Sequence, residues 1–237
     1  MVKRVEELDW QGTPMGEISL RRRIEPTLGV EVYEVKLGEQ FLMSSLFTVA
    51  EVELARLGLA AVTADDLDVV VGGLGLGYTA RAVLTDARVR SLVVVEALDA
   101  VVSWHRRGLL PLADELTTDP RCRLLTDDFF ALVAGPDGFG AQDRVHAVLL
   151  DIDHTPRHVL HPSHAAFYEA AGLRRLAARL HPGGVFALWS DDPPDQDFER
   201  VLTAVFATAQ SHVVTFDNPL TGGRAANTVY VATVASA

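Results

Sequence analysis

The sequence of 237 residues has little cysteine and no excess of basic residues. Its single cysteine, Cys122, excludes a framework of disulfides within the chain and is typical of the reducing cytoplasm, where we expect this protein. The formal net charge of −11 argues against nucleic acid as a partner, because that partner requires a cationic surface. An acidic protein can attract a cationic ligand such as a polyamine, although the same charge also serves solubility.

Long hydrophobic runs are also missing. No apolar run approaches the roughly 18 residues that cross a bilayer, and the N-terminus lacks the features of a signal peptide. We therefore expect no membrane segment. Hydrophobic residues still make up 49% of the chain, which is enough for one main domain and a small appendage.

The most informative motif is an apolar strand, 68–72, that runs into a glycine-rich turn. Gly73, Gly75 and Gly77 let the backbone turn sharply and let a ligand approach where a Cβ would clash. The helix that follows directs its amide hydrogens at the turn. The next strand ends in Glu96, which can accept hydrogen bonds from both hydroxyls of a ribose. This combination predicts a nucleoside-binding site.

Two classes of nucleoside fit this turn. Residues 75–80 satisfy the dinucleotide pattern G-x-G-x-x-G/A, so NAD is one candidate. The earlier start of the glycines, at Gly72, favours an S-adenosylmethionine (AdoMet) type of ligand. A second acidic site after the third strand favours it too, since such folds contact the adenine amino group there. We predict AdoMet or its decarboxylated form as co-substrate, bound by Gly73, Gly75, Gly77, Glu96, Asp127 and Asp128.

Strands and helices alternate from residue 67 onward. Strands are expected at 68–72, 91–96, 122–126, 145–151 and 184–190, and helices at 78–85, 98–109, 128–134, 163–180 and 195–209. The alternation predicts an α/β fold with a doubly wound, mostly parallel, Rossmann-like sheet of the AdoMet methyltransferase type. Two last strands, at 212–216 and 228–234, predict a C-terminal antiparallel hairpin.

Residues 1–48 differ from the rest and predict a small antiparallel β-unit. Its strands are expected at 16–24, 30–37 and 40–43, with glycine-bearing turns between them. A helix at 48–61 leads into the main, nucleoside-binding α/β domain, which we place at 49–237.

The fourth parallel strand ends in two acids and a histidine, Asp151, Asp153 and His154. Carboxylates at that place can deprotonate an amine nucleophile or steer a cationic one. Asp151 and Asp153 alternate along the strand, so only one can point into a given pocket unless the chain turns between them. A polar cap between strand and loop is the alternative. We assign all three residues as catalytic, with Asp151 as the base.

Two other polar clusters follow. His154, His158, His161 and His164 lie close together, but prolines interrupt any helix and no standard zinc spacing results, so we expect no metal. The acidic stretch 191–197 is either a mobile lid over an amine or the start of a helix whose dipole the acids complement. We favour the helix start.

With these motifs the chain resembles the spermidine synthase (polyamine aminopropyltransferase) family. The resemblance covers the N-terminal β-unit, the glycine turn 72–77, and the stretch from Phe167 to Val185. Val95-Glu96 stands at the family's ribose-binding acid, Thr126-Asp127 at its adenine contact, and Leu150-Asp151 at its catalytic aspartate. The resemblance implies a transferase that acts on a small-molecule amine and forms a homodimer.

The chain departs from the family's pattern at several places. Leu74 and Leu76 stand in the glycine motif, where the family carries an acid that grips the amino group of decarboxylated AdoMet. The family's D-S-x-D-P is one residue longer here, from Asp151 to Pro156. The stretch 44–53 has no counterpart of the family's diamine-contacting motif, and Trp189 stands where the family usually has glutamine.

The reaction predicted is transfer of an alkyl (aminopropyl) group to an amine. Methyl transfer differs only in which sulfonium carbon faces the acceptor, so a small-molecule AdoMet-dependent methyltransferase is an alternative. A non-catalytic nucleoside-binding homologue is another, because the diamine motif is missing. An NAD-dependent oxidoreductase is the third.

Overall fold

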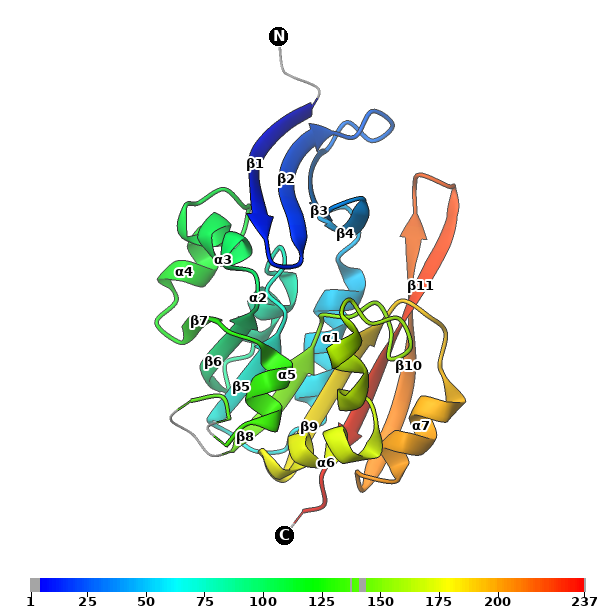
Figure 1. The fold of residues 1–237 in the computed structure, drawn as a ribbon. Coiled ribbons are helices and arrows are strands. Elements are labelled where there is room, and N and C mark those ends of the chain that lie inside the picture. Colours follow the sequence, from blue (N-terminus) through cyan, green and yellow to red (C-terminus); the bar gives the residue numbers. More distant parts are fainter. Residues whose placement is uncertain (1–4, 137, 141–143, 237) are drawn as a thin grey trace.

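The computed structural model describes residues 5–136, 138–140 and 144–236, which form two β-sheets (Figure 1). The smaller sheet has four antiparallel strands in the order β1-β2-β3-β4. Its strands are β1 (Val5–Thr13), β2 (Gly16–Ile24), β3 (Glu31–Leu37) and β4 (Gln40–Ser44). The predicted N-terminal antiparallel unit is thus confirmed as a sheet, while its status as a separate domain stays a prediction.

The first strand, β1, was not predicted. Its pairing with β2 shifts register between Glu7 and Asp9, which marks a β-bulge. A bulge inserts an extra residue and so breaks the alternation of apolar and polar side chains on which the prediction depended.

Three consecutive arginines in β2 form ion pairs with both neighbouring strands. Arg21 and Arg23 point to the same face and contact Glu34 of β3, at 2.6 and 2.8 Å. Arg22 points to the other face and contacts Glu6 of β1 at 2.6 Å. These cross-strand pairs therefore help to fix the register of the small sheet.

The larger sheet has seven strands in the order β10-β11-β9-β8-β5-β6-β7. Its strands are β5 (Leu67–Gly72), β6 (Val89–Glu96), β7 (Cys122–Thr126), β8 (Val145–Leu150), β9 (Leu180–Ser190), β10 (Thr208–Asn218) and β11 (Gly223–Thr233). Strands β5 to β9 are parallel to one another, and β10 and β11 form an antiparallel hairpin at the β9 edge. This topology confirms the predicted fold class.

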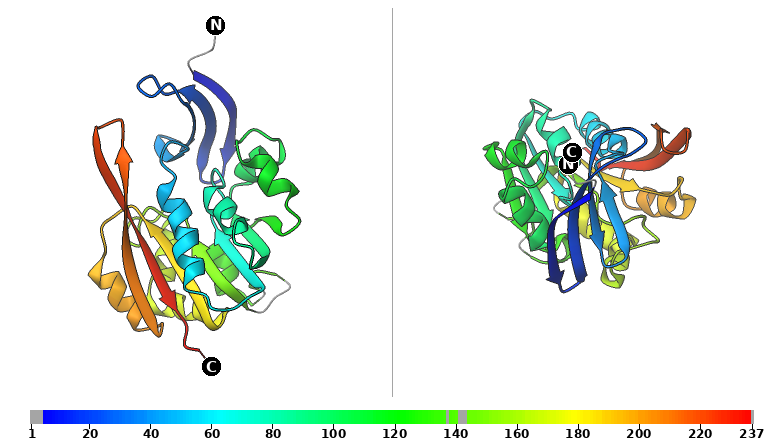
Figure 2. Two further views of the ribbon diagram at one scale, coloured as in Figure 1. Left: turned by 180° about the vertical axis from the view of Figure 1, so that it is seen from behind. Right: turned by 90° about the horizontal axis from the view of Figure 1, so that it is seen from above.

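Helices cover both faces of the larger sheet, because alternate residues of its strands point to opposite sides. Val69 and Val71 of β5 pack in one hydrophobic cluster, and Val70 packs in the other. The first cluster includes α1 (Val49–Ala60), α2 (Tyr78–Leu84), α3 (Asp99–Arg106) and α4 (Ala113–Thr118), and Figure 2 shows α1 lying along this face. The second includes α5 (Phe129–Ala134), the 3₁₀ helix η1 (Pro162–Phe167), α6 (Ala170–Ala178) and α7 (Gln196–Thr203).

Three predicted helices were wrong in extent, of which the one expected at 98–109 is α3 and ends at Arg106, and α4 was not predicted. The helix expected at 195–209 ends at Thr203, because Phe206 is buried in the core and the Ala207 N–H pairs with the Thr233 carbonyl at 2.9 Å. Tertiary packing and strand pairing thus override the helix propensity of this alanine-rich segment. The helix expected at 163–180 is split by an extended Glu169, and β9 already begins at Leu180.

The chain order places the topological switch point of the sheet between β5 and β8. The chain runs from β5 outward to β6 and β7 and then crosses to β8 on the other side of β5. Ligands of doubly wound sheets bind at the carboxyl ends of the strands at this switch point. The small sheet lies beyond these strand ends (Figure 1). In the described part of the chain, no helix has the length and hydropathy to cross a membrane.

Candidate active site

The glycine turn after β5 adopts a backbone that requires glycine. Gly73 has φ +93°, and a Cβ there would lie 2.1 Å from the carbonyl oxygen of Asp151. Gly75 has φ +49°, and a Cβ there would lie 2.7 Å from Sδ of Met43. The missing side chains thus let the turn pack against the end of β8 and let β4 close over it. Gly77 precedes α2 as its N-cap residue.

Glu96, at the end of β6, holds the glycine turn in place. Its Oε2 accepts a hydrogen bond from the Leu74 N–H at 3.0 Å, and its Oε1 accepts one from the Leu98 N–H at 2.9 Å. Burial raises the pKa of Glu96, and these backbone donors oppose the rise. The N–H groups of Gly75 and Ala97 also approach this carboxylate, which borders the cavity described next.

Two cavities meet at this turn. The Glu96 cavity, of about 290 Å³, has walls that include Glu96, Leu98, Asp128, Phe130 and His164. The Trp189 cavity, of about 400 Å³, has walls that include Phe47, Glu51, His154, Trp189 and Phe216. Met43, Gly73, Gly75 and Asp151 border both cavities.

Asp151 follows β8 directly and lies where the two cavities join. Its N–H donates to the Gly72 carbonyl at 2.8 Å, so the chain stays paired with β5 at this point. Its Oδ2 accepts a hydrogen bond from Thr79 Oγ1 at 2.8 Å. Burial raises the pKa of Asp151 to about 6, against the opposing effect of the Thr79 hydroxyl.

Glu51 brings a second carboxyl group to this place, and sequence reasoning missed it. It lies in the first turn of α1 and borders the Trp189 cavity. Burial and the negative charge of Asp151 raise the pKa of Glu51 to about 8. The ionisation of Asp151 therefore favours the protonated form of Glu51 near neutral pH. A lone acid in a helix carries no signal in the sequence that could have revealed this.

Asp153 lies apart from Asp151, as alternation along the strand implies. Its side chain is fully buried, and it lines neither cavity. It accepts hydrogen bonds from the Leu160 N–H at 2.6 Å, from the Tyr168 hydroxyl at 2.8 Å and from His164 Nδ1 at 2.9 Å. This geometry orders the loop after β8, and the reaction proposed below does not use Asp153.

His154 borders the Trp189 cavity and links it to the small sheet. The Gln40 side-chain amide of β4 donates to His154 Nε2 at 2.7 Å. The contact joins the loop after β8 to β4, which forms part of the cavity wall. A catalytic role for His154 stays a prediction.

The two acids after β7, Asp127 and Asp128, lie in different surroundings. Asp128 borders the Glu96 cavity and caps α5, with its Oδ1 accepting from the Phe130 and Ala131 N–H groups at 2.8 and 3.2 Å. Asp127 is exposed, lines neither cavity, and accepts from the Asp128 N–H at 2.8 Å. Only Asp128 of this pair reaches a cavity wall.

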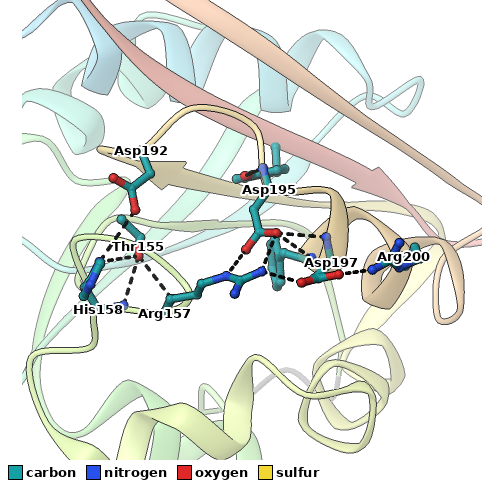
Figure 3. Close-up of polar contacts among 9 residues, drawn as sticks. Thr155, Arg157, His158, Asp192, Asp195, Asp197 and Arg200 are labelled. Atoms are coloured by element: carbon teal, nitrogen blue, oxygen red, sulfur yellow. Dashed lines mark hydrogen bonds and ion pairs between the residues drawn. The ribbon is translucent and has the colours of Figure 1, made fainter.

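The acidic stretch 191–197 is the start of a helix (Figure 3). Asp195 caps α7, accepting from the Asp197 N–H at 2.8 Å, and it pairs with Arg157 at 2.9 Å. Asp197 pairs with Arg157 at 2.6 Å as well. Asp191 differs, since it accepts from the Asn227 side chain at 2.8 Å and borders the Trp189 cavity.

The four histidines of the loop after β8 have separate partners. His154 contacts Gln40, His158 lies 3.6 Å from Asp192, His161 contacts Ser163, and His164 contacts Asp153. Within residues 5–136, 138–140 and 144–236, no group of three or more His, Cys, Asp or Glu side chains is arranged to hold a metal ion.

Comparison with curated proteins finds a polyamine aminopropyltransferase that is similar in sequence. No protein-family model matches the chain. Over 158 residues, 62% of this chain, it is 32% identical to polyamine aminopropyltransferase 2 of Pseudomonas aeruginosa, and the match covers 42% of that protein. The chain thus spans less than half the length of this curated relative.

Solved structures share the fold over nearly the whole chain. Spermidine synthase from Thermotoga maritima matches 96% of this chain and 72% of its own, with a TM-score of 0.72 and 16% identity. A spermidine synthase in complex with the transition-state analogue AdoDATO matches 96% of this chain and 73% of its own, with a TM-score of 0.73 and 15% identity. The predicted resemblance is confirmed: the chain is spermidine-synthase-like in its fold and in the sequence it shares with a polyamine aminopropyltransferase.

Proposed function

We propose that this chain transfers an aminopropyl group from decarboxylated AdoMet to a small amine. The observation that carries the proposal is the position of Asp151, which borders both cavities at the carboxyl end of β8. A carboxylate at this junction faces both reactants of a transfer reaction. The similarity to polyamine aminopropyltransferase 2 supports the same chemistry.

The donor nucleoside is assigned to the Glu96 cavity. Glu96 borders this cavity at the end of β6, where an acid can accept hydrogen bonds from the two ribose hydroxyls. Gly73 and Gly75 border both cavities, so the sulfonium end of the donor can lie along the turn, where the side chain of Met43 packs over Gly75. Asp128, on the wall, and Asp127, beside it, are the acids proposed to contact the base.

The acceptor amine is assigned to the Trp189 cavity. Phe47, Trp189 and Phe216 give this cavity aromatic walls that can pack against methylene groups and attract a cation. Glu51 and Asp151 place carboxyl groups on the same walls. An aliphatic amine that arrives as a cation matches this combination of apolar and acidic groups.

The pair of carboxyl groups suits the proton transfer. The unprotonated amine nitrogen attacks the methylene carbon next to sulfur; the N–C bond forms as the C–S bond breaks, and methylthioadenosine leaves with the bonding electron pair. The positive charge is then on nitrogen, whose proton passes to Asp151. With a pKa raised to about 6, Asp151 is ionised at neutral pH and is a stronger base than an exposed aspartate.

Glu51 supplies a carboxyl group that the glycine turn lacks. The turn carries Leu74 and Leu76 where the resembling family has an acid for the amino group of the donor. Glu51 reaches the same junction from α1, and a bound ammonium group would favour its ionised form over the protonated one. We propose that Glu51 holds the amino group of the aminopropyl chain.

The test is turnover with purified protein, decarboxylated AdoMet and a panel of diamines, with methylthioadenosine measured by chromatography. We expect product with at least one amine, and a rate lowered by about tenfold or more in Glu51→Gln. Glu53→Gln is the matched control, since Glu53 lies on the same helix and pairs with Arg56 outside both cavities.

Other outcomes of this assay separate the alternatives. Methylated amine from AdoMet, with no product from the decarboxylated donor, would show a methyltransferase. Calorimetric binding of methylthioadenosine without turnover of any amine would show a nucleoside-binding homologue. No binding of any adenosine thioether would overturn the proposed function as a whole.

We also propose a homodimer, located in the cytoplasm, in which the small sheet contributes to the interface. β1 is an edge strand that exposes Val5 and Trp10, at 55% and 52% of their surface. Such a strand can pair with a second copy of the chain. Light scattering after size exclusion tests this, with Trp10→Lys expected to lower the dimer fraction.

A further inference from the structure

His164 is a wall residue of the Glu96 cavity that the proposed reaction does not use. It lies in η1 and is buried, with 9% of its surface exposed. Its ring stacks on Phe130, with centroids 3.9 Å apart and planes inclined by 22°. The stacking fixes the plane of the imidazole at the cavity wall.

Asp153 fixes the tautomer of His164. Its two carboxylate oxygens lie 2.9 and 3.2 Å from Nδ1 of the histidine. The carboxylate is ordered in turn by Leu160 N–H and by the Tyr168 hydroxyl. Because a carboxylate only accepts hydrogen bonds, the proton of the neutral imidazole is on Nδ1, and Nε2 carries a lone pair.

Within the described residues, Nε2 of His164 has no hydrogen-bond partner. The hydrogen bonds of this ring are those of Nδ1 with Asp153, and its ring neighbours are Phe130, stacked, and His161, tilted. The neighbouring Asp128 uses Oδ1 to cap α5, and Asp127 lies outside the cavity. The histidine therefore offers an unoccupied acceptor at this end of the cavity.

We infer that His164 reads the base of the bound nucleoside, with Nε2 accepting a hydrogen bond from the exocyclic amino group of adenine. That group is the only N–H donor of the adenine ring system, and the ribose hydroxyls are taken by Glu96. Asp153 is the positioning residue, because its contact with Nδ1 places the proton of the neutral imidazole there and leaves the lone pair on Nε2. The inference rests on the proposed function only in placing an adenine nucleoside in the Glu96 cavity.

The test compares methylthioadenosine with methylthioinosine, whose 6-oxo group turns the donor into an acceptor. Calorimetry of the wild type is expected to favour methylthioadenosine by about ten- to hundredfold, since two lone pairs would face each other in the inosine complex. His164→Phe keeps a ring on Phe130 but removes the acceptor, so it is expected to bring this ratio well below that of the wild type. His158→Phe, at an exposed histidine of the same loop that lines neither cavity, is the matched control and is expected to keep the wild-type ratio.

Asp153→Asn separates positioning from a merely structural role. The asparagine amide can donate to Nδ1, which moves the imidazole proton to Nε2 and turns the acceptor into a donor. We expect the preference to shift toward methylthioinosine. A structural role alone would weaken both ligands by the same factor and leave their ratio unchanged.

A measurement on the wild type covers the case in which a variant does not fold. In spectra of protein labelled with ¹⁵N-histidine, Nε2 of His164 is expected to shift with methylthioadenosine and to stay in place with methylthioinosine. An unchanged ratio in folded His164→Phe, or an unshifted Nε2, would overturn this inference alone. If the wild type binds neither nucleoside, the inference and the proposed function both fail, whereas binding without turnover counts only against the proposed reaction.

Discussion

The two cavities that join at Asp151 are built from the sequence in different ways. The Glu96 cavity takes much of its wall from short segments that follow the parallel strands, such as the glycine turn, Glu96 to Leu98, and Asp128 to Phe130. The Trp189 cavity shares the glycine turn and Asp151, and takes the rest of its wall largely from β4, the start of α1, the end of β9 and the hairpin β10–β11. The walls that belong to the Trp189 cavity alone therefore depend more on how distant segments pack.

This difference explains why local motifs in the sequence indicate a nucleoside site, whereas no local motif marks the walls of the Trp189 cavity. A positive φ at Gly73 and Gly75 demands glycine, so the turn leaves a visible mark in the sequence. A side chain such as Phe47 or Phe216 can line a cavity or fill a core with equal physical ease. Its residue type alone does not distinguish the two.

The largest expected effect is at the residue that the two cavities share. Asp151→Asn removes the proton acceptor but keeps the size of the side chain and its contact with Thr79. We expect kcat to fall by about 10²–10⁴-fold, while the affinity for methylthioadenosine, measured by calorimetry, stays close to that of the wild type. A parallel loss of binding and rate would contradict a role specific to the reaction.

The next largest effect is expected at the glycine turn, and it concerns binding in the Glu96 cavity and the stability of the fold. Gly73→Ala places a Cβ 2.1 Å from the Asp151 carbonyl oxygen at φ +93°. We expect about 1–3 kcal/mol lower stability in urea denaturation and a marked loss of methylthioadenosine binding. Gly12→Ala is the control, because nothing lies within 4 Å of a Cβ at that position. Unchanged stability and binding in Gly73→Ala would show that the turn can relax.

The third effect is a pH dependence of the stability, which arises from Glu51 on the wall of the Trp189 cavity. The pKa of Glu51 is raised from 4.5 to about 8 in the folded protein, so the folded state keeps a proton that the unfolded chain loses. Its contribution to stability is complete below the unfolded value and is lost as pH rises through about 8. Glu51→Gln is therefore expected to gain stability relative to the wild type between pH 5 and pH 9, by urea denaturation. A difference between the two proteins that does not change with pH would rule out this coupling.

The smallest effect is expected outside both cavities. Arg157→Ala removes the exposed ion pairs with Asp195 and Asp197, and exposed pairs contribute only about 0–1 kcal/mol. We expect a slightly lower melting temperature and an unchanged KM for the amine. A large rise in this KM would instead support the lid interpretation of residues 191–197.

Much of the fold could be predicted because its signals are local. The strand before Gly73, the strand ending in Glu96 and the final hairpin each carry their own pattern of apolar residues. The wrong predictions concern elements whose extent depends on contacts between residues far apart in the sequence. Phe206 joins the core and ends α7 early, and the bulge near Glu7 hides β1.

The candidate site divides in the same way. Asp151 could be predicted, because the end of a parallel strand at the switch point has a fixed place in this fold. Glu51 could not, since its pKa and its role depend on meeting Asp151 across the sheet edge. The alternation along β8 left open which acid would face the cavities, and packing assigns Asp153 to the buried network with His164 and Tyr168.

The sequence by itself determined the doubly wound sheet, the glycine turn and the acid at the end of β6. Those features follow from backbone geometry and from the period of apolar residues, which act within a few residues of each other. Only the tertiary structure decided that Met43 closes over Gly75 and that the charge of Asp151 raises the pKa of Glu51. The physical reason is that burial and Coulomb interaction depend on distance in space, and in each pair the partners lie far apart along the chain.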